Sequence, residues 1–146
     1  MTTDAITFTE TESAYLSSQM IGRLATVDPS GAPQNNPVGF QLDEVAHQLI
    51  IGGEELGASR KFRNATANTS VAFVVDDLAS TDPWTPRGVE IRGVAQTLRD
   101  VEPPMEGFSR EIIRITPLWV ATWGIQPGTE LIFEVRRAGE TTGSRR

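Results

Sequence analysis

The sequence predicts a mainly β fold, a small barrel or sandwich of short strands with one or two flanking helices. Its 146 residues suit one domain with its own core. About seven short apolar runs are separated by turn signals rich in Gly, Pro, Asp and Ser. A doubly wound nucleotide-binding fold is disfavoured, because the sequence contains neither Gly-x-Gly-x-x-Gly after its first strand nor a Walker-type lysine motif.

Composition excludes several kinds of protein. Hydrophobic residues make up 38% and charged residues 22%, which is typical of a globular domain. The formal net charge of −6 disfavours nucleic acid as a partner, and no apolar run is long enough to span a membrane. Without cysteines or a signal-peptide pattern, the chain is expected to be cytoplasmic. The one histidine, His47, is expected to lie exposed in a polar turn, which disfavours a catalytic triad or a metal site.

The N-terminal region predicts a helix. Thr9 and Glu12 have the spacing of a capping box, in which each side chain accepts a backbone N–H of the other. The helix is expected from Glu10 to about Gln19, with Tyr15 and Leu16 on its buried side.

Three strands should follow this helix. Arg23–Val27 reads as the first strand, and Asp28–Gly31 has the composition of a tight turn. The returning strand, 32–42, contains Pro37, which cannot donate a ladder hydrogen bond and therefore predicts an edge or a local distortion. Leu49–Gly52 is the third strand.

A cationic segment stands out in this acidic chain. The helical pattern of Glu54–Asn68 places Leu56, Phe62 and Ala65 toward the sheet. Within it, Gly57–Asn64 contains Arg60, Lys61 and Arg63. Two interpretations stay open at this point: an anion-binding segment, or a solvated basic face paired with Glu54 or Glu55.

The second half of the chain predicts further strands. Alternation that shifts phase at Gly93 indicates a β-bulge in the strand Gly88–Arg99. The other expected strands are Thr69–Asp76, Ile112–Ile125 and the alternating Leu131, Phe133 and Val135, the last two strands being joined by a turn at Gln126–Gly128. Asp77–Pro86 is expected to be a loop, and Asp100–Glu111 a loop or broken helix.

Six segments stand in an order and spacing that can be compared with known families: Arg23–Gly31, Asn36–Phe40, Arg60–Asn64, Asp82–Gly93, Arg114–Pro117 and Thr122–Gly124. Together these segments resemble the pyridoxamine-phosphate-oxidase-like split-barrel flavoproteins. The resemblance is nearest to the branch that uses the deazaflavin F420 and to its subgroup of tetracycline-biosynthesis reductases.

The resemblance implies a six-stranded split β-barrel of the FMN-binding kind and a homodimer with cofactor sites at its interface. Residues 1–137 would form the domain and 138–146 a flexible C-terminal tail. Phosphate ligands would come from the cationic segment, ring contacts from the Pro37 strand, and tail or substrate contacts from Trp84 and Arg87 of either subunit. The implied cofactor-binding residues are Asn36, Pro37, Val38, Gly39, Gly52, Gly53, Ser59, Arg60, Lys61, Arg63, Trp84 and Arg87.

The implied function is hydride transfer between reduced F420 and an activated C=C of a small organic substrate, such as a polyketide or tetracycline-type intermediate. Arg and Lys suit a phosphodiester because they donate charge-assisted hydrogen bonds. The hydride chemistry belongs to the cofactor, which fits a chain without an evident acid–base pair. Two alternatives remain: an FMN-dependent oxidase or reductase, and a flavin-binding protein without catalysis.

Overall fold

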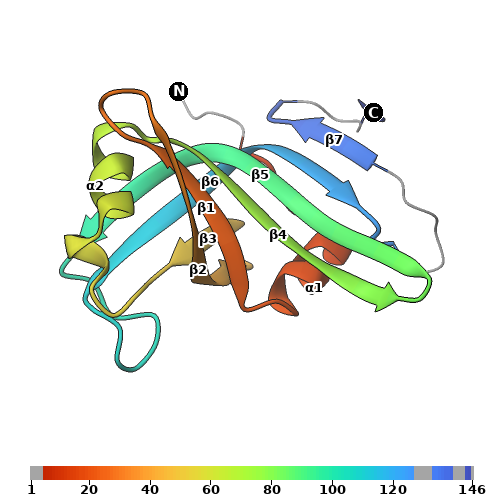
Figure 1. The fold of residues 1–146 in the computed structure, drawn as a ribbon, viewed down its shortest axis with the longest axis horizontal. Coiled ribbons are helices and arrows are strands. Elements are labelled where there is room, and N and C mark those ends of the chain that lie inside the picture. The colour runs from red at the N-terminus through yellow and green to blue at the C-terminus, as the bar shows by residue number, and fades with distance from the viewer. Residues whose placement is uncertain (1–4, 127–132, 140–143, 146) are drawn as a thin grey trace.

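Six strands close into a ring that two helices flank (Figure 1). The computed structural model describes residues 5–126, 133–139 and 144–145. The sheet order is β3-β2-β1-β4-β5-β6-β7-β8, and an additional pairing of β3 with β6 closes the ring. The predicted mainly β split barrel is therefore confirmed. The strands are β1 (Ile21–Val27), β2 (Pro33–Asp43), β3 (Gln48–Ile51), β4 (Ser70–Thr81), β5 (Trp84–Arg99), β6 (Glu111–Trp123), β7 (Phe133–Arg137) and β8 (Ser144–Arg145).

The helices cover the ring at separate places. They are α1 (Glu10–Ser17) and α2 (Arg60–Ala67), and a 3₁₀ turn at Leu56–Ala58 precedes α2. Leu16 of α1 and Phe62 of α2 are almost fully buried in the same core cluster as the strand residues. Neither helix is long and apolar enough to cross a membrane, nor is any other helix of the described residues.

Two strands change partners along their length, and this opens the barrel. Residues 33–39 of β2 pair with β1, whereas 40–43 pair with β3. Likewise β6 pairs with β3 at 113–115 and with β7 at 119–123. Pro37 lies in the half of β2 whose second edge meets no strand among the described residues. The predicted edge is confirmed, and the register through Pro37 is continuous rather than distorted.

Local sequence signals are confirmed where hydrogen bonds lie within a few residues. Thr9 and Glu12 form both bonds of the capping box. The Gly31 N–H donates to the Asp28 carbonyl at 2.9 Å, and Gly31 has φ +89°, which suits glycine. The register shifts between Arg92 and Gly93, as a bulge requires.

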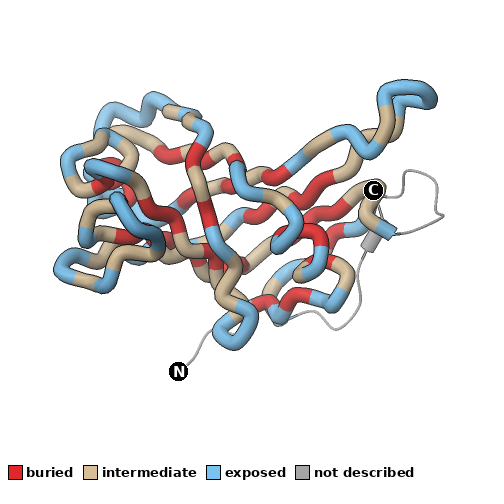
Figure 2. Tube along the Cα trace, turned by 90° about the horizontal axis from the view of Figure 1, so that it is seen from below, coloured by how far each residue is buried: buried red, intermediate tan, exposed pale blue. Residues whose placement is uncertain are grey.

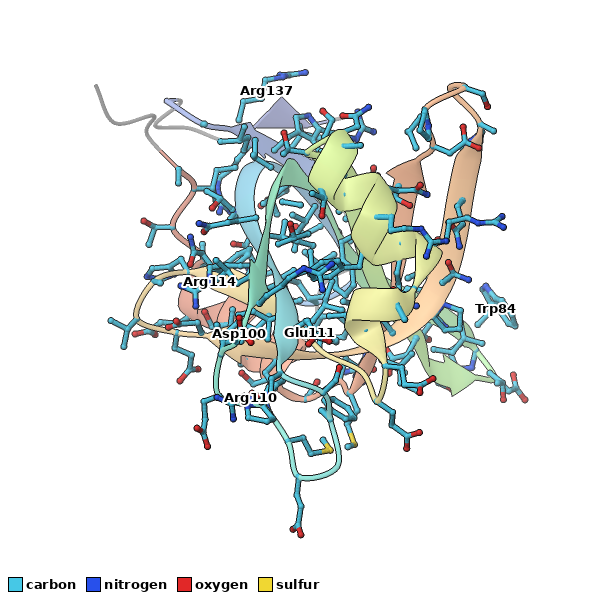
Figure 3. The ribbon with its side chains drawn as sticks, turned by 90° about the vertical axis from the view of Figure 1, so that its left-hand side faces the viewer. Trp84, Asp100, Arg110, Glu111, Arg114 and Arg137 are labelled. Atoms are coloured by element: carbon cyan, nitrogen blue, oxygen red, sulfur yellow. The ribbon has the colours of Figure 1, made fainter. Side chains whose placement is uncertain are left out.

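The predicted helix over Glu54–Asn68 is wrong in its first part, because α2 begins only at Arg60. Tertiary contacts take the N–H groups before that point. The Leu56 N–H donates to Ser109 Oγ, and the Gly57 N–H donates to a carboxylate oxygen of Glu111, both at 3.0 Å. Figure 3 shows Glu111 beside the start of this segment. These groups therefore hold the segment against β6 and its preceding loop.

The loop predicted over Asp77–Pro86 is also wrong, because β4 and β5 continue through it as a hairpin. Asp77 lies directly opposite Arg87, and the two side chains form an ion pair. Such cross-strand pairs stabilise a sheet even where Asp, Pro, Ser and Thr suggest a loop. The tip of this hairpin is exposed (Figure 2).

Two further expectations concern His47 and the C-terminus. His47 is half-buried rather than exposed, and its Nδ1 accepts the Phe8 N–H at 3.1 Å, so it holds the N-terminal segment.

The predicted tail, 138–146, lies mostly outside the described residues, as do Leu131 and the turn expected at Pro127. Within that range, Ser144–Arg145 pair with β7.

Candidate functional site

The start of α2 presents two cations beside two available backbone N–H groups. Phe62 and Ala65 are buried, which leaves Arg60 exposed and Lys61 half-exposed on the outer side. Neither cation forms an ion pair with another described residue. The backbone N–H groups of Arg60 and Lys61 meet no acceptor in the described part of the chain. First-turn N–H groups and nearby cations together favour an anion.

Ser59 and Arg63 form bonds that shape this segment. Ser59 Oγ accepts the Phe62 N–H at 3.3 Å as the N-cap of α2, and its hydroxyl donates to the Leu56 carbonyl. Arg63 Nη1 donates to the Ala58 carbonyl at 3.0 Å. Both side chains therefore fix the turn into α2, and their contact with phosphate stays a prediction.

The strand predicted to face a flavin ring lies along the open edge of β2. Val38 is buried in the core, so its side chain points into the barrel and its backbone lies along that edge. Asn36 is half-buried and Pro37 is exposed. A Cβ built on Gly39 would meet only the Met20 carbonyl oxygen, at 4.0 Å. The space over Gly39 is therefore open to a ligand.

A chain of hydrogen bonds joins α2 to β2. The buried Asn64 amide donates to Thr26 Oγ1 at 3.1 Å and to Gln34 Oε1 at 2.9 Å. The Gln34 amide in turn donates to Asn36 Oδ1 at 2.8 Å. The structure thus connects the cationic helix with the predicted ring wall. Sequence reasoning missed Asn64 and Gln34. The sequence did contain one signal for Asn64: it is a polar residue at a position of the predicted helix that faces the core, where a polar side chain needs a hydrogen-bond partner.

The charge at α2 also acts on the turn between β1 and β2. The pKa of Asp28 is lowered mainly by the hydrogen bond from the Ser30 hydroxyl and next by the Ala32 N–H. The positive charge of Arg60 adds a smaller lowering. The positive charge of Arg60 therefore favours the ionised form of Asp28 in this turn.

Gly52 and Gly53 lie against the segment 100–110. Ser109 donates to the Gly53 carbonyl from its backbone N–H at 2.8 Å and from its hydroxyl at 3.0 Å. A Cβ built on Gly52 would lie 2.6 Å from Pro104 Cγ and 2.7 Å from Phe108 Cδ2. The segment 100–110 thus approaches this glycine pair closely, and contact of the pair with a cofactor stays a prediction.

We expect Gly52→Ala to lower the free energy of unfolding by about 1–3 kcal/mol, because the added methyl would displace Pro104 and Phe108. Gly39→Ala is the matched control, since its methyl enters open space, and its change should stay within about 0.5 kcal/mol. Urea unfolding of both variants measures the difference. Equal losses of stability would contradict the packing at Gly52.

Trp84 and Arg87 are not brought to α2 within one chain. The β4–β5 hairpin and α2 occupy opposite ends of the long axis (Figure 1), and Figure 3 shows Trp84 set apart from α2. Trp84 is 70% exposed at the hairpin tip. Arg87 forms two hydrogen bonds to the Asp77 carboxylate, at 2.7 and 2.8 Å, and its guanidinium lies 5.2 Å from the Tyr15 ring centroid.

Tyr15, Asp77 and Arg87 form one polar cluster that attaches α1 to the hairpin. The Tyr15 hydroxyl donates to Asp77 Oδ1 at 2.9 Å. Burial, and then the bond to Asp77, raise the pKa of Tyr15, so the phenol remains neutral. The hydrogen bonds from Arg87 lower the pKa of Asp77. The Tyr15 proton is therefore held by Asp77, which makes it a poor proton donor for a substrate.

Asp77→Asn should reduce stability at pH 7 by about 1–2 kcal/mol, because the bonds to Arg87 lose their charge assistance and are partly screened. The pKa of folded Asp77 lies below its unfolded value near 3.9. Its contribution is therefore present above about pH 4 and lost as the pH falls through the folded pKa. The free energies of unfolding of the wild type and the variant, measured in urea, should accordingly approach each other as the pH falls below about 4.

Asp76→Asn is the control for this measurement. Asp76 pairs with Arg23 where both side chains are largely exposed, 50% and 42%. Its loss should cost about 0–1 kcal/mol. A cost as large as that of Asp77→Asn would contradict a special role for the Tyr15 cluster.

Comparison with known proteins agrees with this architecture. A reductase of 5a,11a-dehydrotetracycline and 5a,11a-dehydrooxytetracycline from Streptomyces rimosus is 43% identical over 95% of this chain and 99% of its own. A solved structure called an F420 reductase is 28% identical, with a TM-score of 0.57, over 73% of this chain and 93% of its own.

A more distant likeness supports the fold alone. A pyridoxamine 5'-phosphate oxidase-related, FMN-binding protein from Nostoc punctiforme has a TM-score of 0.62 at 14% identity, over 92% of this chain and 89% of its own.

At 43% identity to a reductase over nearly the full length of both chains, this chain is an oxidoreductase. The pyridoxamine 5'-phosphate oxidase family profile matches residues 8–132, and the chain belongs to that family.

Proposed function

We propose that this protein is an F420-dependent reductase acting on an activated C=C of a polyketide or tetracycline-type intermediate. The observation that carries the proposal is the start of α2, where Arg60, Lys61 and two backbone N–H groups have no partner among the described residues. A phosphodiester would supply the missing acceptors. The 43% identity to a dehydrotetracycline reductase supports the reaction class and the substrate class.

In this proposal, different residues bind different parts of the cofactor. Arg60 and Lys61 hold the phosphate, while Ser59 and Arg63 keep the turn into α2 in shape. The open edge of β2 from Asn36 to Gly39 offers backbone groups to the ring, and Gly52 and Gly53 lie nearby. When bound, the reduced deazaflavin supplies a hydride which, with a proton from solvent, saturates the C=C.

FMN is the second candidate cofactor. Its phosphate monoester would also satisfy the two cations and two N–H groups of α2. Titration of the purified protein with F420 and with FMN, followed by quenching of cofactor fluorescence, distinguishes them. We expect saturable F420 binding. Tight FMN binding without F420 binding would overturn the F420 assignment, and binding of either without turnover would favour a flavin-binding protein.

We infer a homodimer with the cofactor sites at its interface. The outer face of the sheet carries an apolar hollow whose lining includes Val94, Leu118 and Trp119, and Val94 is 42% exposed. Trp84 is exposed at the hairpin tip, far from α2 of its own chain, and would reach the site of a partner. Light scattering should give about twice the monomer mass.

Two further expectations remain predictions: that residues 1–137 form one domain, and that the protein is cytoplasmic.

A further inference from the structure

A pocket of about 410 Å³ lies beside the predicted ring wall. One wall is the end of α1 with Met20, another is the β2–β3 hairpin from Gly39 to Ile50, and the third is the segment 100–110 with Met105 and Phe108. This volume lies within the range of small-molecule sites. The pocket thus adjoins the open space over Gly39 without including the cationic residues of α2.

The third wall is fixed rather than loose. Ser109 is bonded twice to the Gly53 carbonyl, and the Gln41 amide donates to the Pro104 carbonyl at 3.1 Å. Phe108 packs over Gly52, which has no side chain to prevent it. The pocket is therefore formed before any ligand enters, so binding does not have to order this wall.

The chemistry of the lining differs from that of α2. None of the described residues that line the pocket is charged, and its polar members are Ser17, Gln19 and Gln41. Two flexible methionines flank it, Met20 at 75% and Met105 at 47% exposure. Apolar walls with a few neutral polar groups favour an uncharged, largely apolar body. Charged groups would lose hydration here without gaining a counter-ion.

We propose that this pocket binds the body of the substrate, an uncharged fused-ring organic molecule, and that Met20 and Met105 help to determine specificity. The proposal rests on the proposed reductase function for the identity of the ligand as substrate. In this arrangement the anionic part of the cofactor lies at α2 and the neutral substrate lies past Gly39, so opposite ends of the β2 wall receive ligands of different chemistry.

The two methionines provide a direct test. The chain contains three methionines, so methyl-¹³C-methionine labelling gives three signals, and the Met20→Leu and Met105→Leu variants assign two of them. The probe is 2-(hydroxymethyl)anthraquinone, an uncharged three-ring molecule, titrated without cofactor. We expect saturable shifts of the Met20 and Met105 signals together. Anthraquinone-2-sulfonate, with the same rings and a negative charge, should bind at least fivefold more weakly.

A charge at the pocket mouth should abolish most of this binding. We expect Met105→Glu to weaken the probe at least tenfold and to raise the KM for substrate, with little change in cofactor affinity. Val45→Glu is the matched control, because Val45 is 93% exposed in the β2–β3 turn and does not line the pocket. It should leave the probe affinity unchanged.

Two results would overturn the pocket assignment: methionine signals that do not respond to the neutral probe, or equal losses of affinity in Met105→Glu and Val45→Glu. Failure of the proposed function is a separate result, since it would appear as absence of F420 and FMN binding in the cofactor titration while the methionine signals still respond to the probe.

Discussion

Replacing Arg60 and Lys61 together by alanine is expected to weaken cofactor binding at least tenfold, while the protein remains folded. Each side chain is free of ion pairs with the described residues, so its removal breaks no ion pair within that part of the fold. A charge-assisted hydrogen bond to phosphate contributes about 1.5–3 kcal/mol, and about 1.4 kcal/mol corresponds to a tenfold change. Fluorescence titration with F420 measures the effect, and circular dichroism checks the fold.

The control must separate local contact from overall charge. Arg110→Ala removes one positive charge from an exposed position on the segment before β6, so it measures the effect of a changed net charge without a change at α2. Arg110→Ala should leave cofactor affinity within about twofold, because an exposed charge that does not contact the cofactor is largely screened by salt. Unchanged cofactor affinity in the double variant would show that Arg60 and Lys61 are solvated surface residues and do not bind the cofactor phosphate.

Arg136→Met is expected to cause the largest loss of stability, about 3–5 kcal/mol, or about 10 °C in the midpoint of thermal unfolding. Glu12 is 3% exposed, and its carboxylate accepts the Thr9 N–H and hydrogen bonds from both terminal nitrogens of Arg136. The substitution would leave a buried carboxylate without its cation. It would also release Thr7, whose carbonyl accepts from Arg136 Nη2 at 3.1 Å.

Two further variants show why Arg136→Met loses stability. Arg23→Met removes the same side chain from the exposed pair with Asp76 and should cost only about 0–1 kcal/mol. The double variant Glu12→Gln/Arg136→Met should be more stable than Arg136→Met alone, since no charge is left buried. A double variant as unstable as the single one would show that lost packing of Arg136, rather than the stranded carboxylate, dominates.

The candidate site could be predicted from the sequence in part. The concentration of Arg60, Lys61 and Arg63 in an acidic chain drew attention to α2, and Pro37 marked the strand beside it. Other parts have no local signal. Asn64 and Gln34 are 30 residues apart, yet they connect the two halves of the site. The resemblance implied tail or substrate contacts from Trp84 and Arg87 of either subunit, and the β4–β5 hairpin places both at the opposite end of the molecule from α2.

Sequence by itself determined the features whose interactions lie within a few residues: the capping box at Thr9, the turn that ends at Gly31, the bulge at Gly93 and the mainly β class. These features depend on short hydrogen bonds and on the φ angles that glycine permits. Together with the family motifs, they were sufficient to predict the barrel.

Only the tertiary structure decided where α2 begins, that Asp77–Pro86 is a hairpin, and that Glu12 meets Arg136 across 124 residues. The reason is that distant partners supply the energy in each case. The N–H groups of Leu56 and Gly57 donate to Ser109 and Glu111. The Asp77 carboxylate accepts hydrogen bonds from Arg87 and Tyr15. Such partners are fixed by how the strands close into a ring, and no local pattern contains that closure.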